Sequence, residues 1–205
     1  MCVVTSLIVQ ALWLALAVTV SGVLHMVVVK KDLFSALRVP IDGGRTVGGE
    51  RLFGDNKTWR GVVFMVAATA LLGAVQGLAG GTWATSAGIA PMDFGAWGLA
   101  SGALAQATGY ALVNAVLGLG YVVGELPNSF AKRRLNITPG KTDGGLTGKL
   151  FLVIDQADSV IAALVIGALL FGWSLAFVLV GIGTLTLLHL AFNFVLYVVK
   201  VRKNF

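Results

Sequence analysis

Five long apolar runs constrain this chain of 205 residues more than any other feature of its sequence. A helix needs roughly 20 apolar residues to cross the hydrocarbon core of a bilayer, and each of the five runs is about that long or longer. Hydrophobic residues make up 57% of the chain and charged residues only 12%, which excludes an ordinary soluble domain. We therefore predict an all-α integral membrane protein that forms a single domain over residues 1–205. Its five transmembrane helices are expected at about residues 5–29, 61–80, 97–124, 151–172 and 175–199.

The positions of the basic residues predict the orientation of these spans. All 15 Lys and Arg residues lie in the loop 30–60, in the loop 125–150 and in the C-terminal tail after residue 199. The opposite ends of the spans carry a single charged side chain, Asp93. Because Lys and Arg near span ends are retained on the cytoplasmic side, we predict a multi-pass protein of the cell membrane with its N-terminus outside and both loops in the cytoplasm.

Both cytoplasmic loops have a composition suited to binding anions. Cations alternate with glycine, asparagine and hydroxyl residues in the segments 40–61 and 124–149. Glycine lets backbone N–H groups approach a phosphate closely, while Arg and Lys neutralise its charge. Part of the net charge of +6 is also explained by the retention of Lys and Arg on the cytoplasmic side and by their attraction to anionic lipid headgroups. The sequence gives no indication of nucleic-acid binding.

Two acids, Asp155 and Asp158, lie near the start of the fourth apolar run. Residues three apart share one face of a helix, and two like charges beside a low-dielectric region are costly unless a cation bridges them. Magnesium, which binds one or two carboxylates together with substrate phosphates, fits this requirement. Two alternatives stay open: pairing of each acid with a loop cation, and a small transporter that binds its cation here. A transporter usually has a site at the bilayer midplane and paired repeats, whereas these acids lie at the edge and we find no repeat.

A second group of polar residues follows the third apolar run. Pro127 is suited to the first turn of a helix, so we predict that a new helix begins at about Leu126. Counted from Glu125, the spacings of four, seven and eight residues place the group on one helical face. Paired acids, this face and a glycine-rich basic loop are the parts needed to transfer a phosphoryl or nucleotidyl group. The face carries Glu125, Ser129, Lys132 and Arg133.

These segments resemble a known family. The stretch ELPNSFAKRRLNITPG, followed by DQADS, resembles the signature of the membrane CTP-dependent cytidylyltransferases, and PIDGGRTVGGERLFGDNKTWRG resembles the first loop of their CDP-archaeol synthase branch. Two departures from the wider phosphatidate-type pattern favour the archaeol-type branch. Lys141 follows Pro139-Gly140 where the wider family has histidine, and Gln156 stands where arginine is usual.

The resemblance implies transfer of CMP from CTP to a membrane lipid phosphate, of the archaeol phosphate or phosphatidate type, with Mg²⁺ held by Asp155 and Asp158. It also implies that Ser129, Lys132 and Arg133 hold the phosphates of CTP, with Lys132 and Arg133 taking part in catalysis. Further contributions to the nucleotide or phosphate site are expected from Asn56, Lys57, Thr58, Arg60 and Gly140. Glu125 is a candidate third metal contact. A phosphate monoester has a second pKa near 6, so the attacking phosphate requires no general base.

The remaining expectations concern partners and the residues left outside the site. CTP, a lipid phosphate and membrane lipids are the expected partners, and a homodimer stays open. We expect a groove between spans, below the acids, that keeps the hydrocarbon chains of the substrate in the bilayer. His25 and His189 are interpreted as hydrogen-bonded packing residues, and the roles of Asp42 and Asp55 stay open.

Overall fold

The computed structural model describes residues 3–90, 102–138 and 145–199. Five helices in these ranges are long and apolar enough to cross a membrane, which confirms the predicted fold class. The second of them begins as α2, passes through one wider π-helical segment, η2 (Gly77–Gly81), and ends as α3 (Thr82–Ser86). The long helices are α1 (Val3–Lys30), α2 (Trp59–Gln76), α4 (Ala103–Arg134), α5 (Gly145–Phe171) and α6 (Leu175–Val198).

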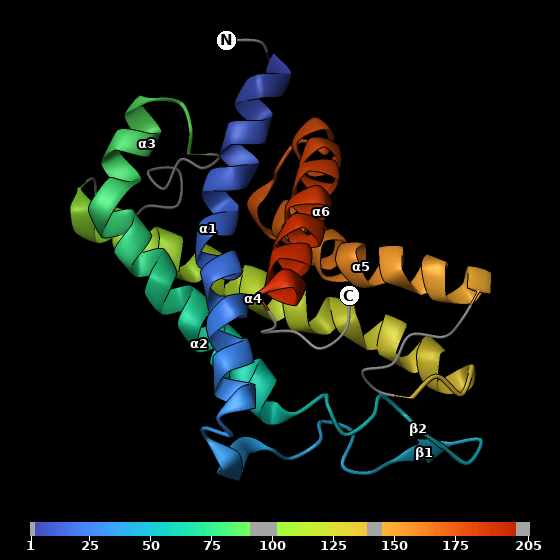
Figure 1. Ribbon diagram of the computed structural model, residues 1–205. Coiled ribbons are helices and arrows are strands. Elements are labelled where there is room, and N and C mark those ends of the chain that lie inside the picture. The colour runs from blue at the N-terminus through green and yellow to red at the C-terminus, as the bar shows by residue number, and fades with distance from the viewer. Residues whose placement is uncertain (1–2, 91–101, 139–144, 200–205) are drawn as a thin grey trace.

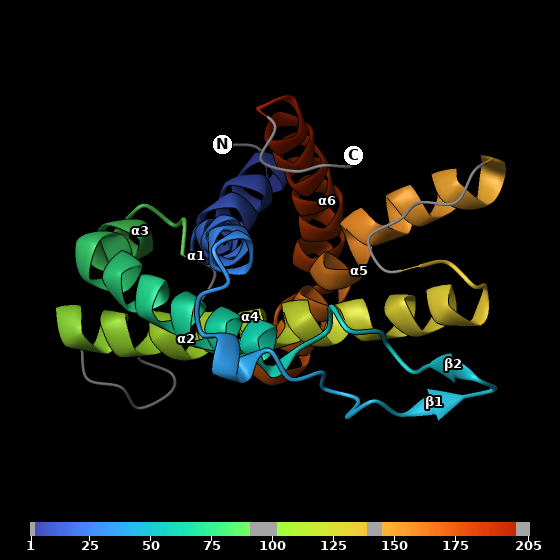
Figure 2. The ribbon, with the colours of Figure 1, turned by 60° about the horizontal axis from the view of Figure 1, so that its bottom comes forward.

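Helix α4 is the centre of the bundle. It crosses α1 and α6, which stand side by side, and α2 lies along its N-terminal half (Figures 1 and 2). Helix α5 packs on α4 and also contacts α6. Buried apolar side chains from four of these helices form one core, so the bundle is held together around α4. This core includes Leu14 of α1, Tyr110, Val113 and Leu117 of α4, Leu164 of α5, and Phe177 of α6.

Glycines bring α2 into backbone contact with α4. A Cβ atom built on Gly73 would lie 2.5 Å from the Tyr110 carbonyl oxygen, and one built on Gly77 would lie 2.4 Å from the Gln106 carbonyl oxygen. Small residues at four-residue spacing allow this close approach of membrane helices. The α2–α4 contact therefore depends on the absence of side chains at these two positions.

Helix α4 does not break at Pro127, so the prediction of a new helix from about Leu126 is wrong. The helix is continuous from Ala103 to Arg134, with Pro127 inside it. Proline removes one backbone hydrogen bond and is tolerated in membrane helices, where neighbouring helices compensate. As a result, the first ten residues of the segment expected to be a loop at 125–150 are helical, and α5 begins before the predicted span.

The connection between α1 and α2 folds onto the C-terminal end of α4. It contains a 3₁₀ turn, η1 (Ser35–Leu37), and a two-stranded antiparallel hairpin of β1 (Thr46–Val47) and β2 (Glu50–Arg51). Arg134 of α4 donates hydrogen bonds to three hairpin carbonyls, those of Val47, Glu50 (3.0 Å) and Arg51 (2.7 Å). The hairpin and the end of α4 therefore lie at the same end of the bundle, visible at the right of Figure 1.

We expect Gly77→Ala to destabilise the protein, because the added methyl group meets the α4 backbone, which cannot move aside. Overpacking of this kind costs about 1–3 kcal/mol. The measurement is the thermal unfolding midpoint in detergent. The matched control is Gly183→Ala, at a helical glycine of α6 with no atom within 4 Å of the added Cβ. An equal effect of the two substitutions would contradict the close contact.

Candidate active site

The candidate site lies where two glycines of α4 bring it into backbone contact with α5. A Cβ atom built on Gly120 would lie 2.8 Å from the Ala163 Cα. One built on Gly124 would lie 2.7 Å from the Asp158 carbonyl oxygen and 2.9 Å from the Ser159 Cα. The α5 backbone beside Asp158 therefore rests directly on Gly124.

The two acids of α5 meet an amide and an ammonium group from the next turns of α4. The Asn128 amide nitrogen donates to Asp155 Oδ1 at 2.6 Å and to Asp158 Oδ2 at 2.7 Å. Lys132 forms an ion pair with Asp155, with 2.6 Å between Nζ and Oδ2. Asp158 Oδ1 also accepts hydrogen bonds from the backbone N–H (2.6 Å) and the hydroxyl (3.1 Å) of Ser159. The carboxylates thus converge on one point, as expected for residues on one helical face.

The connection between α1 and α2 reaches the same region through Lys57. Its ammonium group pairs with the Glu125 carboxylate of α4, and 16% of the Lys57 side chain and 30% of the Glu125 side chain are exposed. Thr58 caps α2 by accepting a hydrogen bond from the Gly61 N–H (3.4 Å). This places Asn56, Lys57 and Thr58 at the cavity described below.

Other residues predicted for the site have different partners. Arg60 is buried and donates to Asp32 at 2.6 Å and to the Leu33 carbonyl at 3.2 Å, at the end of α1. Arg133 is buried and donates to the Ile137 carbonyl, which closes the end of α4. Ser129 is buried in α4. Gly140 lies outside the described residues.

Glu125 pairs with Lys57 instead of joining the two aspartates. Within the described part of the chain, no group of three or more His, Cys, Asp or Glu side chains could hold a metal ion. Asp155 and Asp158 are therefore the paired acids that the structure brings together, and Asn128 and Lys132 are their immediate partners.

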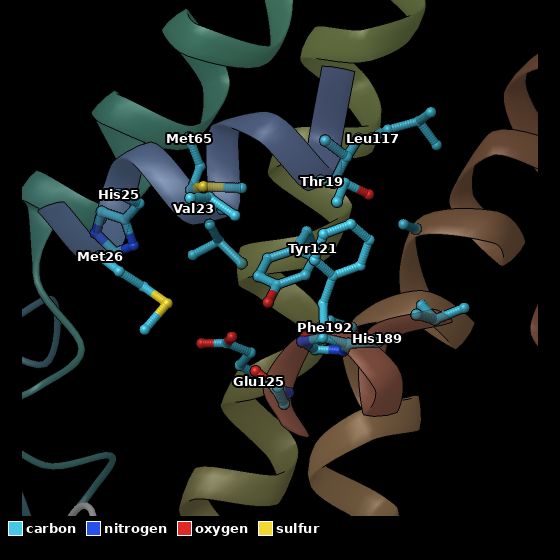
Figure 3. A pocket seen from close by; sticks show the side chains of 18 of the residues that line it. Thr19, Val23, His25, Met26, Met65, Leu117, Tyr121, Glu125, His189 and Phe192 are labelled. Carbon is cyan, nitrogen blue, oxygen red and sulfur yellow. The ribbon is translucent and has the colours of Figure 1, made fainter. Parts of the chain in front are cut away.

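A cavity of about 550 Å³ connects this region with the interior of the bundle. Figure 3 shows side chains of α1, such as Thr19 and Val23, facing Phe192 of α6 across Tyr121 of α4, with Glu125 of α4 below them. The polar lining includes Lys57, Glu125 and Asp155, whereas most of the wall is apolar. The apolar lining includes Leu14, Val18 and Met26 of α1 and Leu185, Leu188 and Leu196 of α6.

The comparisons with known proteins agree with this architecture. A model of a family described as CarS-like, CDP-archaeol synthase, matches residues 4–205. The chain belongs to the CDP-archaeol synthase family. This confirms the resemblance seen in the two loop motifs, and it makes the chain an enzyme, a CTP:lipid-phosphate cytidylyltransferase.

Relatives in the CDP-archaeol synthase family cover most of the chain. The CDP-archaeol synthase of Halobacterium salinarum is 36% identical over 173 residues, which are 80% of this chain and 81% of the relative. That of Methanopyrus kandleri is 30% identical over 168 residues, which are 80% of this chain and 78% of the relative. A solved structure, described as an intramembrane enzyme for archaeal membrane lipids biosynthesis, is 25% identical with a TM-score of 0.53. The match covers 92% of this chain and 91% of the chain of that structure.

Asn128 is a residue of this CDP-archaeol synthase family member that the sequence patterns did not single out. Gly120, Gly124, Asn128 and Lys132 recur at four-residue spacing, which places them along one face of a continuous helix. The new helix predicted from about Leu126 separated the two glycines from Asn128 and Lys132. Once α4 is known to continue through Pro127, the four-residue spacing places Asn128 on the same face as Lys132.

Asp42 organises the connection between α1 and α2. Its side chain is fully buried, pairs with Arg51 at 2.6 Å, and accepts hydrogen bonds from the N–H groups of Gly44, Phe53 and Gly54. Burial by itself raises the pKa of the Asp42 carboxyl, but Arg51 and the backbone donors outweigh it and hold that pKa below its ordinary value. Asp55 also pairs with Arg51, but its side chain is exposed.

We expect Asp42→Asn to destabilise the protein by about 2 kcal/mol at neutral pH, because a buried charged acceptor is lost. Since the folded-state pKa is lowered, the stabilisation is fully present above the ordinary value of 3.8 and disappears as pH falls through the folded value. The difference in unfolding midpoint between wild type and variant should therefore shrink below pH 3.8. Asp55→Asn, at the exposed partner of Arg51, is the control and should change little. A pH-independent difference for Asp42→Asn would refute this account.

Proposed function

We propose that the protein transfers CMP from CTP to a lipid phosphate of the archaeol type, with Mg²⁺ and with release of pyrophosphate, at the cytoplasmic side of the cell membrane. The observation that carries this proposal is the cavity, because Lys57 and Asp155 line the same space as the apolar faces of α1 and α6. A substrate with a charged head and hydrocarbon chains fits such a space. The names of the curated relatives support archaeol phosphate as the acceptor.

The residues at the end of the cavity fit a magnesium ion. One oxygen of Asp155 and one of Asp158 lie within 2.7 Å of a single atom, the Asn128 amide nitrogen. Two converging carboxylates are the protein contribution that Mg²⁺ usually takes, and phosphates and water supply its other ligands. Asp155 and Asp158 would hold the ion, which would neutralise charge on the phosphates of CTP.

Lys132 pairs with Asp155, and Lys57, which pairs with Glu125, lines the same cavity as Asp155. Both lysines are largely shielded from solvent, with 13% and 16% of their side chains exposed. They are suited to holding the phosphates of CTP. In the proposed reaction, an oxygen of the lipid phosphate attacks the α-phosphorus of CTP. A new P–O bond forms, the bond between the α-phosphorus and the bridging oxygen breaks, and pyrophosphate leaves with that electron pair. The attacking phosphate is largely dianionic at neutral pH, so no side chain has to remove a proton.

The transporter alternative is not favoured, because the family match and the curated relatives describe enzymes. The acids support the same choice. Asp155 is hydrogen-bonded to α4 residues that belong to the family signature motif, including Asn128 and Lys132. A cation site used for transport has no need of a neighbouring cluster of phosphate-binding cations.

The test of the proposed function is incubation of the purified protein with CTP labelled at the α-phosphate, Mg²⁺ and either archaeol phosphate or phosphatidate, followed by organic extraction. We expect label in the lipid phase with archaeol phosphate. Asp155→Asn and Asp158→Asn should each lower turnover by about a hundredfold or more, because each removes a charged oxygen ligand. Glu50→Gln, at an exposed acid of the hairpin, should leave turnover unchanged. Label that is independent of Mg²⁺ or of the two aspartates would reject the proposal.

A second prediction concerns the lipid chains. Leu188 lines the cavity, whereas the neighbouring Leu187 is 68% exposed on the outer face of α6. We expect Leu188→Trp to raise the KM for lipid phosphate about tenfold, because the indole narrows the apolar space, while the KM for CTP stays unchanged. Leu187→Trp is the matched control and should change neither value. Equal effects of the two substitutions would place the lipid elsewhere.

A further inference from the structure

The two polar atoms of the Asn128 amide differ: the nitrogen donates two short hydrogen bonds, and the oxygen accepts none from the described residues. Its nitrogen bridges Asp155 Oδ1 at 2.6 Å and Asp158 Oδ2 at 2.7 Å. Its oxygen is buried and accepts no hydrogen bond from the residues that the structure describes. A buried acceptor without a partner is unfavourable and uncommon in folded proteins, so this oxygen needs an explanation.

A bridge between two carboxylates does not by itself require an amide. A lysine or an arginine offers only donors and would join the acids without leaving a buried acceptor unpaired. An asparagine at this position adds an oxygen that the two acids cannot use. A hard cation can use it, because amide and carboxylate oxygens are ligands of the same kind for Mg²⁺.

The ligand count at the acids points in the same direction. Over the described ranges, Asp155 and Asp158 are not joined by a third His, Cys, Asp or Glu that could complete a metal site, and Glu125 is paired with Lys57. Magnesium takes six oxygen ligands in a near-octahedral arrangement. The Asn128 side chain contacts both acids and carries an unpaired oxygen, so it is placed to supply a further ligand.

We propose that Asn128 is the third protein ligand of the cation site, an inference that rests on the function proposed above. In the cation-free protein its two N–H groups hold the carboxylates together. When the cation binds, rotation of about 180° about the Cβ–Cγ bond exchanges the two ends of the planar amide. The rotation turns Oδ1 toward the point on which the carboxylates converge.

The rival explanation, a purely structural bridge, predicts the opposite change in affinity. If Asn128 only separates the acids, its removal leaves two facing carboxylates without a shared donor. Cation binding then becomes tighter or stays unchanged, because the repulsion between like charges favours a cation. If Asn128 is a ligand, its removal weakens binding. The sign of the change therefore decides between the two roles.

The experiment measures Mn²⁺ binding to the purified full chain in detergent without CTP, from the electron paramagnetic resonance signal of free Mn²⁺. We expect Asn128→Ala and Asn128→Leu to bind about tenfold or more weakly than wild type. Asn128→Asp, which puts an oxygen on both ends of the side chain, should bind more tightly than wild type. The control is Asn136→Gly, because Asn136 is an exposed asparagine beyond α4 with a φ of 56°, which glycine adopts readily.

Unchanged or tighter binding by Asn128→Ala and Asn128→Leu would overturn the ligand role. Should both variants fail to fold, Asn128→Asp decides, and binding no tighter than wild type would overturn the proposal. Asp155→Asn separates this result from failure of the proposed function. If wild type binds Mn²⁺ and Asp155→Asn does not, the cation site stands whatever Asn128 does. If wild type and Asp155→Asn bind alike, the cation site and the role of Asn128 both fail.

Discussion

The close contact between α4 and α5 is the constraint on which the rest of the site depends. Gly124 carries no side chain, so the α5 backbone at Asp158 and Ser159 can rest against it. Any larger residue would push α5 outward and draw the aspartates away from α4. Asn128 and Lys132 lie one and two turns further along the same face, so the glycine contact sets the distance across which they reach the acids. Backbone packing, more than the loops, therefore positions the charged groups.

The charged groups at the cavity are already paired within the protein. Lys132 pairs with Asp155, Lys57 pairs with Glu125, and Asp158 accepts hydrogen bonds from Asn128 and Ser159. Unpaired charges this close to a bilayer are costly, so this pairing is favourable. Under the proposed function, the phosphates of CTP compete with carboxylates for the two ammonium groups. On binding, each lysine would exchange a carboxylate partner for a phosphate of CTP. The carboxylates would then need a new positive partner, so such a site favours CTP together with a cation.

The sequence was sufficient to predict the five spans, because apolar length and composition decide whether a helix crosses a membrane. It was also sufficient for the paired acids, which depend only on helical spacing. It failed at Pro127, because proline favours the first turn of a helix but lies here inside the continuous helix α4. The pairing of Lys57 with Glu125 and of Asp42 with Arg51 could not be predicted, because each joins residues that only the tertiary fold brings together.

The histidine of α6 contacts α5 and also lines the cavity. His189 was interpreted as a hydrogen-bonded packing residue, and its Nδ1 lies 3.1 Å from the Gln156 carbonyl oxygen. Because a carbonyl only accepts, Nδ1 carries the proton. Asn193 donates to the Gln156 side chain, and both α6 residues line the cavity. Gln156 directly follows Asp155, so α6 is tied to the segment of α5 that bears the acids. Under the proposed function, a lipid chain that displaces α6 would also disturb this segment, which would couple the width of the apolar cavity to the geometry of the two acids.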